Sequence, residues 1–303
     1  MSNIIEIVEV GPRDGFQSIG PLIPTKRKLE LVDMLYDAGI RRMEATAFVS
    51  TSAVPQLADA AALLEHIAGK PDLDAQVLVP SLRHAERAIA AGATHLAFVL
   101  SVSEKHNKGN VRRSPAESVH EFGELAKLVP AGARLRLNLA TAFDCPFDGA
   151  VPAAATLALL EPLVAIAPEA EFCLCDTTGR VTPDRVASLF DAARDANPTA
   201  QRWAFHGHDT YGQGVSNAVA AWNAGINVID SSFAGLGGCP FAPGATGNVA
   251  TEDLVWTFTE MGVSSGIDLP RLIAAAREAA ELPGASFGGR VRDALRARTR
   301  IAA

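Results

Sequence analysis

Short apolar runs alternate with longer amphipathic segments along most of this chain. The runs are rich in β-branched residues and are typical of buried strands, whereas the longer segments repeat apolar residues at helical spacing. In Thr25–Ala38, for example, Val32 and Leu35 share one face. The predicted strands are Ile4–Val10, Arg42–Phe48, Gln76–Pro80, His95–Val102, Arg134–Ala140, Glu171–Cys175, Trp203–Asp209 and Asn227–Phe233. The predicted helices that follow them are Thr25–Ala38, Val54–Ile67, Leu82–Ala91, Ser114–Leu128, Pro152–Ile166, Thr182–Ala196, Val215–Asn223 and Thr251–Met261.

Eight strand–helix units in 303 residues predict a TIM (β/α)8 barrel, an α/β fold. The alternative is a doubly wound open sheet, which rarely has eight units this regular. We expect residues 1–263 to form the barrel domain and residues 264–303 to form a C-terminal helical extension packed on it. The extension ends in a run of arginines, Arg290, Arg292, Arg296, Arg298 and Arg300, which indicates a solvated face.

Composition narrows the classes of partner. The net charge is -7 and the pI is near 5.5, which argues against a nucleic-acid partner because that would need a basic face. No apolar run reaches the roughly 20 residues of a membrane span, so we expect no membrane partner. We also expect no signal peptide, because residues 1–10 already read as a strand. Four cysteines are too few for a disulfide framework, and the cytoplasm is the expected location.

Polar residues gather just past the predicted strands, where the active site of such a barrel lies. The N-terminal ends of the strands show no comparable set. One mouth of the barrel is therefore expected to collect acids, imidazoles and one arginine. These residues are Arg13, Asp14, Glu44, Thr46, Asn138, Thr141, Asp176, Thr177, His206, His208, Ser231 and Ser232.

Two of these residues indicate a metal site. His206 and His208 stand two positions apart on a predicted strand, so both imidazoles point to the same side. With the carboxylate of Asp14 they make a three-point grip, and the amide oxygen of Asn248 offers a fourth, hard ligand. Nitrogen and oxygen ligands without cysteine fit Mg²⁺, Mn²⁺, Co²⁺ or Zn²⁺. The alternative is that the two histidines only form hydrogen bonds inside the barrel.

Arg13 precedes Asp14 and is well placed to bind a developing oxyanion. The alternative is a salt bridge with Asp176 or Glu44 at the barrel mouth, and the two roles are compatible.

The four cysteines divide into two kinds. Cys173 and Cys175 lie in an apolar strand and are expected to pack in the interior, and Cys145 is expected to be structural. Cys239 lies in a glycine-rich segment, 235–240, that has too little bulk to fill a core. It is either a mobile proton donor or a chance cysteine in a surface loop.

With these residues in view, the chain resembles the 3-hydroxy-3-methylglutaryl-CoA lyase family over essentially its whole length. The glycine-cysteine segment that contains Cys239 is the family's own signature. The matching segments are Val10–Gln17, Phe48–Ser50, Val54–Gln56, Cys145–Gly149, Asp176–Thr177, His208–Gln213, Asp230–Phe241 and Gly247–Asp253.

The resemblance implies a TIM barrel with a divalent metal, Mg²⁺ or Mn²⁺, and an acyl-CoA substrate cleaved to acetyl-CoA and acetoacetate in leucine and ketone-body metabolism. It implies that Asp14, His206, His208 and Asn248 are the metal ligands. Arg13 would bind the thioester oxygen and stabilise the enolate, His206 or a water it controls would take the alcohol proton, and Cys239 would protonate the carbon. The remaining implied residues are Glu44 and Asp176, as acidic groups supporting the site, and Gln17 and Asn138, as substrate-binding groups. A homodimer is expected from the resemblance alone.

Three departures from the family pattern bear on the substrate: Ser18–Gly20, Lys105–Arg113, and Asn138 where the family has a tyrosine. A related acyl-CoA such as citramalyl-CoA is therefore the nearest alternative substrate. A condensing acyltransferase of the isopropylmalate synthase type is a second alternative, although such enzymes carry a long C-terminal extension. A metallohydrolase usually places its His-x-His on the first strand, and a non-catalytic barrel would not need the metal set.

Overall fold

The barrel is closed. The computed structural model describes residues 3–238, 247–285 and 287–301. Parallel strands form a ring in the order β1-β10-β9-β8-β5-β4-β3-β2, which confirms the predicted (β/α)8 barrel and excludes the open sheet. The strands are β1 (Glu6–Glu9), β2 (Arg42–Ala47), β3 (Asp74–Val79), β4 (His95–Ser101), β5 (Arg134–Ala140), β8 (Glu171–Asp176), β9 (Arg202–Gly207) and β10 (Val228–Ser231).

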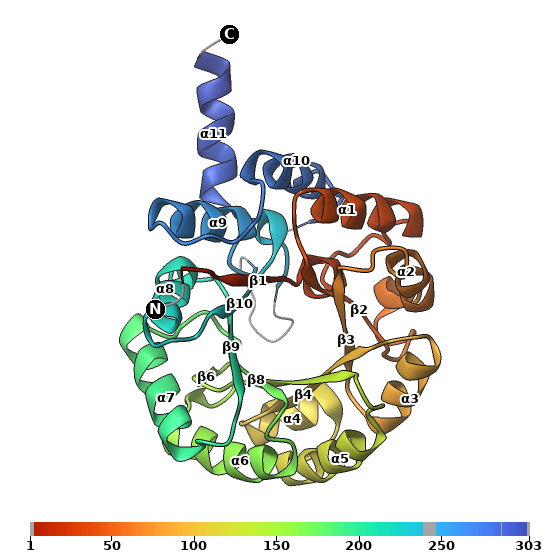
Figure 1. The fold of residues 1–303 in the computed structure, drawn as a ribbon, viewed down its shortest axis with the longest axis vertical. Helices are drawn as coiled ribbons and strands as arrows, with labels where there is room; N and C mark the ends of the chain where they lie inside the picture. The colour runs from red at the N-terminus through yellow and green to blue at the C-terminus, as the bar shows by residue number, and fades with distance from the viewer. Residues whose placement is uncertain (1–2, 239–246, 286, 302–303) are drawn as a thin grey trace.

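Helices surround the ring on its outside (Figure 1). Those of the repeating units are α1 (Thr25–Asp37), α2 (Ala60–Ile67), α3 (Leu82–Ala90), α5 (Pro115–Leu128), α6 (Ala153–Ile166), α7 (Pro183–Ala196), α8 (Gly214–Asn223) and α9 (Thr251–Glu260). Ser114 and Glu117 form a capping box at the start of α5, as their spacing indicates.

Three segments of the described structure differ from the predicted elements. The predicted helix Val54–Ile67 is interrupted, because a short 3₁₀ turn, η2 (Pro55–Leu57), precedes α2. The segment between β4 and α5 contains an additional helix, α4 (Glu104–Val111), which has little apolar periodicity. A small hairpin, β6 (Asp144–Cys145) with β7 (Gly149–Ala150), follows β5 and was also not predicted.

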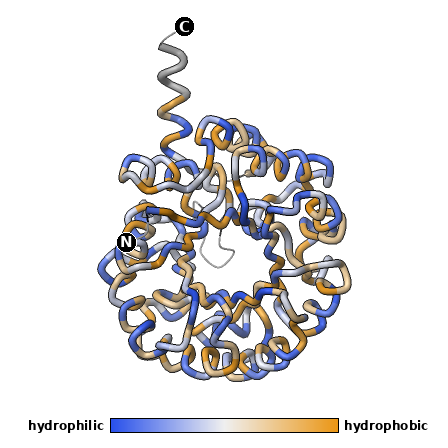
Figure 2. The backbone as a smooth tube through the Cα atoms, viewed as in Figure 1, coloured by the Kyte–Doolittle hydropathy of each residue, from blue (hydrophilic) through white to orange (hydrophobic). Residues whose placement is uncertain are grey.

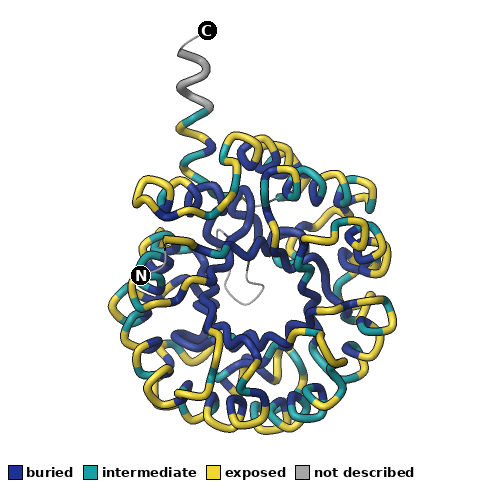
Figure 3. Tube along the Cα trace, viewed as in Figure 1, coloured by how far each residue is buried: buried dark blue, intermediate teal, exposed yellow. Residues whose placement is uncertain are grey.

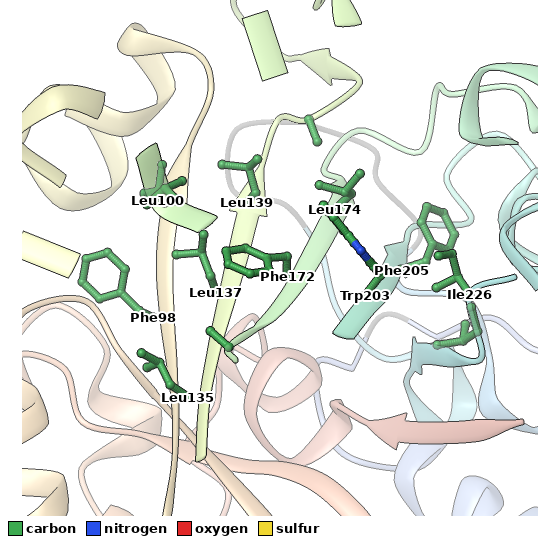
Figure 4. Close-up of a cluster of buried hydrophobic side chains, with 14 of the residues drawn as sticks. Phe98, Leu100, Leu135, Leu137, Leu139, Phe172, Leu174, Trp203, Phe205 and Ile226 are labelled. Atoms are coloured by element: carbon green, nitrogen blue, oxygen red, sulfur yellow. The ribbon is translucent and has the colours of Figure 1, made fainter. Parts of the chain in front are cut away.

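Successive side chains of each strand point alternately outward, to the layer between strands and helices, and inward, to the lumen of the barrel. Outward-pointing aromatic residues of the strands pack against the helices: Phe98 of β4 contacts Phe122 of α5, and Phe205 of β9 contacts Phe190 of α7. Figure 4 shows part of this aromatic and aliphatic layer along β4, β5, β8 and β9. The strand ring is buried, while the outer faces of the helices are exposed (Figure 3). Hydrophobic positions, in orange, and hydrophilic positions, in blue, are interspersed along the strands and the helices (Figure 2). This layer is the hydrophobic core that fixes the barrel.

The lumen of the barrel contains several charged side chains beside apolar ones, and the expectation that the N-terminal strand ends lack a polar set is wrong. Arg42 at the start of β2 pairs with Glu171 (2.5 Å), Glu6 (2.9 Å) and Asp74 (3.2 Å). The N-terminal ends of the strands therefore do carry a polar set. The sequence pattern hid these residues because each belongs to a different strand, and only barrel closure brings them together.

The C-terminal segment contacts the barrel through two helices. Helix α10 (Leu269–Ala280) packs on α1, and α11 (Arg290–Ile301) begins against α9 and then extends away from the barrel (Figure 1). The carboxylate of Asp253 on α9 accepts the backbone N–H groups of Arg290 and Val291 at the start of α11. The division into domains at residues 263 and 264 stays a prediction.

The prediction that the arginines of the C-terminal run are exposed to solvent is wrong for Arg292, which is only 4% exposed. Its guanidinium lies 3.7 Å from the carboxylate of Glu252, a fully buried residue of α9. The run of arginines does not reveal this contact because Glu252 is 40 positions earlier in the sequence. None of the described helices is long and apolar enough to cross a membrane.

Candidate metal centre and acyl-CoA site

Three predicted ligands come together at the C-terminal mouth of the barrel. Ligand atoms of Asp14, His206 and His208 all lie within 4.8 Å of one another. The two imidazole rings stand 5.0 Å apart, centroid to centroid, on the same side of β9 and its extension. The predicted same-side placement of the histidines is confirmed.

A tight turn directs Asp14 into this mouth. After β1 the chain forms one π-helical turn, η1 (Gly11–Gly15), in which the N–H of Asp14 donates to the carbonyl of Val10 at 2.7 Å. A Cβ at Gly11 would lie 2.4 Å from the ring of Phe233. Only glycine therefore allows the turn to approach the end of β10 this closely.

Hydrogen bonds orient each histidine and leave one nitrogen toward the cluster. The Nδ1 of His206 lies 3.0 Å from Oδ2 of Asp230, and the Nδ1 of His208 lies 2.8 Å from the backbone carbonyl oxygen of Asp176. A proton on Nδ1 leaves Nε2 as the ring nitrogen with a free lone pair. This arrangement is typical of histidines that bind metals, whose second nitrogen donates to a carboxylate or carbonyl.

The amide of Asn248 supplies the observation that tests the fit of a metal. Its Nδ2 donates to Oδ2 of Asp14 (2.8 Å) and to the carbonyl of Leu236 (3.0 Å). Its Oδ1 is buried and has no hydrogen-bond partner among the residues that the structure describes. A buried amide oxygen without a partner is costly unless a cation or water satisfies it. One carboxylate and two imidazoles together with such an amide oxygen would form a donor set that fits Mg²⁺ or Mn²⁺.

The protonation of these groups in the metal-free protein is uneven. Burial would raise the pKa of Asp14, but Arg13, His206 and His208 lower it to about 2. Burial would lower the pKa of His206, but its hydrogen bond to Asp230 and nearby negative charges raise it to about 9. Burial and the charge of His206 lower the pKa of His208 to about 4. In neutral solution His208 and Asp14 are therefore ready to bind a cation, whereas His206 must first lose a proton.

Arg13 lies between two carboxylates. Its Nε donates to Oε2 of Glu44 at 2.6 Å, and its Nη1 donates to Oδ1 of Asp14 at 2.5 Å. Of the two predicted salt-bridge partners, the structure pairs Arg13 with Glu44, while Asp176 takes other partners. The side chain of Arg13 is 11% exposed, so it reaches the open mouth while its position is fixed. Such a held guanidinium can stabilise an oxyanion without reorganising.

Asp176 contacts both the loop after β8 and the imidazole of His208. Its carboxylate accepts the backbone N–H groups of Gly179 (3.0 Å) and Val181 (3.4 Å), so it holds the loop after β8. Burial raises its pKa to about 6, although those backbone donors oppose the rise. Its contact with the cluster is the backbone carbonyl that orients His208.

The two predicted substrate-binding residues lie in different surroundings. Asn138 is buried on β5, where its Oδ1 accepts from Nε of Arg136 (2.7 Å) and its Nδ2 lies 3.5 Å from Oε1 of Glu44. Gln17 follows η1 at the mouth and is partly exposed.

The cysteines follow the predicted division as far as the structure describes them. Cys173, Cys175 and Cys145 are all buried, as expected. Cys173 and Cys175 face the lumen with Val8, Val10 and Ala204. Cys239, the predicted mobile acid, lies outside the described residues.

Sequence reasoning did not single out Asp230 and Arg136 as parts of the site. Asp230 orients His206, and Arg136 donates to Asp230 at 2.5 Å. A signal for Arg136 does exist in the sequence, because a charged residue interrupts the apolar run of β5 and must find a partner there.

The HMGL-like family model matches residues 4–278. This chain belongs to the HMGL-like family. Hydroxymethylglutaryl-CoA lyase, mitochondrial, from Bos taurus is 40% identical over 272 residues, covering 89% of this chain and 83% of that protein. 3-Hydroxy-3-methylglutaryl-CoA lyase, cytoplasmic, from Rattus norvegicus is 38% identical, covering 89% of this chain and 79% of that protein.

A solved member of the HMGL-like family shares the whole architecture. The structure of an HMG-CoA lyase from Acinetobacter baumannii in complex with coenzyme A and 3-methylmalate superposes with a TM-score of 0.90 at 35% identity. The match covers 97% of this chain and 96% of that one. The family resemblance expected from the sequence is therefore confirmed.

Proposed function

We propose that this chain is a metal-dependent 3-hydroxy-3-methylglutaryl-CoA lyase, which cleaves its substrate to acetyl-CoA and acetoacetate. The observation that carries the proposal is the cluster of Asp14, His206 and His208, in a chain 40% identical to a lyase of this name over 89% of its length. The metal is proposed to be Mg²⁺ or Mn²⁺, held by these three residues and the amide oxygen of Asn248, which has no hydrogen-bond partner in the described part of the chain.

The substrate is a tertiary alcohol that carries a carboxylate arm and a thioester arm. A divalent cation in this donor set supplies Lewis-acid activation of the alcohol. Arg13, fixed by Glu44 and Asp14, donates to the thioester oxygen as the carbon–carbon bond breaks and negative charge moves onto that oxygen. Stabilising this enolate is the main electrostatic task of the protein.

The structure bears on the two roles predicted for His206. If Nδ1 stays on Asp230 and Nε2 binds the metal, no ring nitrogen remains to take the alcohol proton. The proposal therefore keeps His206 as a ligand and assigns proton removal to a water molecule beside it. Cys239 remains the proposed donor of the proton that converts the enolate to acetyl-CoA. The residues on either side of its segment, Leu236 and Asn248, contact each other at the cluster.

The nearest alternative substrate is citramalyl-CoA. The position of Asn138 beside the site supports this alternative. Asn138 adds an amide, beside Glu44 and Arg136, to the wall below the cluster. The segment 105–113 also departs from the family pattern. Most of it lies in α4, which contains the fully buried Asn107, and Oδ1 of Asn107 accepts the N–H of Ser101 at 2.8 Å.

An acyl-CoA partner, a homodimer and a cytoplasmic location complete the proposal. The relatives named above include one called mitochondrial and one called cytoplasmic, and a solved relative contains coenzyme A.

The deciding experiment is a lyase assay with Mg²⁺ or Mn²⁺ on 3-hydroxy-3-methylglutaryl-CoA beside citramalyl-CoA, scoring the acetyl-CoA formed. We expect faster turnover of the first substrate and loss of activity with EDTA. Turnover of citramalyl-CoA alone would overturn the proposed substrate. Free CoA released from acetyl-CoA and a 2-oxo acid would instead indicate a condensing enzyme.

A further inference from the structure

We propose that Arg136 is a positioning residue that joins the metal-binding half of the site to its oxyanion-binding half from inside the barrel. The inference rests on the proposed function, because it assigns work to a residue below that site. Arg136 is the third residue of β5 and is only 1% exposed, so it lies too deep to touch a substrate at the mouth.

The first arm of Arg136 reaches the metal ligands. Its Nη2 donates to Oδ2 of Asp230 at 2.5 Å, and this same oxygen lies 3.0 Å from Nδ1 of His206. Asp230 is 3% exposed, so its carboxylate has little access to water. The guanidinium therefore fixes the acceptor that in turn fixes the ring of His206. Partners of this kind, one shell behind a ligand, orient it for its metal.

The second arm reaches the oxyanion side. The Nε of Arg136 donates to Oδ1 of Asn138 at 2.7 Å, which leaves Nδ2 of Asn138 directed toward Glu44 at 3.5 Å. Glu44 in turn accepts from Nε of Arg13 at 2.6 Å. A chain of contacts thus runs from Arg136 through one amide and one carboxylate to the guanidinium that meets the thioester oxygen.

Only an arginine can make these contacts together. Its third bond, from Nη1 to Glu171 (3.0 Å), anchors the guanidinium to β8. Three acceptors on three different strands are served by separate nitrogens of one rigid plane. A lysine offers one ammonium on a flexible stem and cannot span them.

The chain offers a matched control. Arg42 is also a buried lumen arginine (3% exposed), and it too binds Glu171. Its other partners, Glu6 and Asp74, lie at the opposite end of the barrel from the metal cluster. A general loss of lumen charge should affect Arg42 and Arg136 variants alike, whereas a positioning role belongs to Arg136 alone.

The test compares Arg136→Gln with Arg42→Gln in Mn²⁺ titrations of the full-length, metal-free protein. We expect Arg136→Gln to weaken Mn²⁺ binding by about 10–100-fold, as loss of a partner behind a metal ligand does. Arg42→Gln should keep the wild-type affinity. In the Mg²⁺-loaded protein, the Nδ1 proton of His206 should give a slowly exchanging low-field NMR signal in wild type and Arg42→Gln, and lose it in Arg136→Gln.

A conservative variant separates the two arms. Arg136→Lys keeps a cation beside Asp230 but loses the donor to Asn138, so it should regain much of the Mn²⁺ affinity while kcat stays low. Wild-type Mn²⁺ affinity and His206 signal in Arg136→Gln would overturn the inference. Equal losses in Arg42→Gln, or a metal affinity in Arg136→Lys as low as in a metal-ligand variant, would also overturn it. Because the titration needs no substrate, a wild-type protein that fails to cleave 3-hydroxy-3-methylglutaryl-CoA would count against the proposed function and leave this test intact.

Discussion

The guanidinium of Arg13 is fixed by two carboxylates and is still partly exposed. Two carboxylates at 2.5–2.6 Å fix its guanidinium, so its orientation requires no ordering when substrate arrives. Burial raises the pKa of Glu44, and the positive charges of Arg13 and Arg136 oppose this rise. Arg13, the proposed oxyanion donor, and Glu44 therefore depend on each other for their positions and charges.

Replacing Arg13 with glutamine should lower kcat by about 10²–10⁴-fold, because the lost interaction is made mainly with the developing enolate. Steady-state kinetics on 3-hydroxy-3-methylglutaryl-CoA measure this, with a melting curve to confirm the fold. Arg27→Gln removes a part-exposed ion pair with Glu278 on the outer helices and should leave kcat unchanged. Near-normal turnover in Arg13→Gln would remove this residue from the mechanism.

The metal affinity should depend on pH through one histidine. With its pKa raised to about 9 in the metal-free protein, His206 is protonated at pH 7 and must lose that proton to bind a metal. Asp14 and His208 already lack protons there, since their pKa values are about 2 and about 4. The apparent Mn²⁺ affinity should therefore rise by up to about tenfold per pH unit between pH 6 and 9.

Calorimetry in buffers of different ionisation enthalpy checks this directly, because it counts the protons released on binding. About one proton should leave per Mn²⁺ at pH 7. An affinity independent of pH, with no proton released, would mean that His206 is already neutral.

The clustering of Asp14, His206 and His208 could be predicted from the sequence, but the residues that orient them could not. His206, His208 and Asp14 carry local signals: spacing of two along a strand, and a place just past a strand end. The partnership of Asp230 with Arg136 has no such signal, because it links residues 94 positions apart. Which charges meet in the lumen depends on strand order and register, which local periodicity does not specify.

At the scale of elements, a short 3₁₀ turn, η3 (Phe233–Gly235), connects the C-terminal helices to the proposed metal site. Ala234 has a left-handed backbone (φ 58°) that a non-glycine residue adopts at some cost. Its N–H donates to Oε2 of Glu252, and its carbonyl accepts the N–H of Gly288. The turn that precedes Leu236 and Asn248 is thus fixed by α9 and by the segment before α11.

Arg292→Ala should destabilise the protein by about 1–3 kcal/mol, because it removes the cation beside the fully buried Glu252. Urea unfolding of the metal-free protein measures the change. Arg290→Ala, an exposed arginine on the same helix, should change stability by less than about 0.5 kcal/mol. Equal effects of the two changes would mean that the contact with Glu252 contributes nothing.

The boundaries of helices and strands could be predicted where the apolar periodicity was strong. The prediction failed where polar side chains form capping or anchoring hydrogen bonds with nearby backbone groups. The strands and most helices of the barrel follow the apolar pattern closely. Helix α4 has no clear apolar face and depends on Ser103, whose hydroxyl accepts the N–H of His106, and on the buried amide of Asn107. Such polar capping and anchoring contacts are specific to a site, and hydrophobic spacing does not reveal them.

At the scale of the molecule, charged groups occupy much of the lumen of this barrel, where aliphatic layers are usual. Arg42, Glu171, Arg136 and Asp230 form a continuous series of ion pairs that ends at His206. Buried ion pairs contribute little net stability, because removing two charges from water costs about as much as their attraction returns. A bound metal should therefore add noticeably to the stability of the fold.

Mn²⁺ at 100 times its dissociation constant should stabilise the folded protein by about 2.7 kcal/mol, since it binds the native state alone. Thermal unfolding with Mn²⁺ and then with excess EDTA measures the gain and its reversal. Asp14→Ala should abolish the gain, because it removes the carboxylate of the cluster. An equal gain in Asp14→Ala would indicate that the cation binds elsewhere.

The pairing of β1 with β10 also has a consequence for biosynthesis. Asp14 is made early, but the amide that meets it, Asn248, follows 234 residues later. A growing polypeptide cannot assemble the cation site until its last β-strand has left the ribosome and the ring has closed. Forming such distant contacts is slow because the intervening chain must first be brought together. Cation capture would thus mark the completion of folding, and a prematurely terminated chain would lack it.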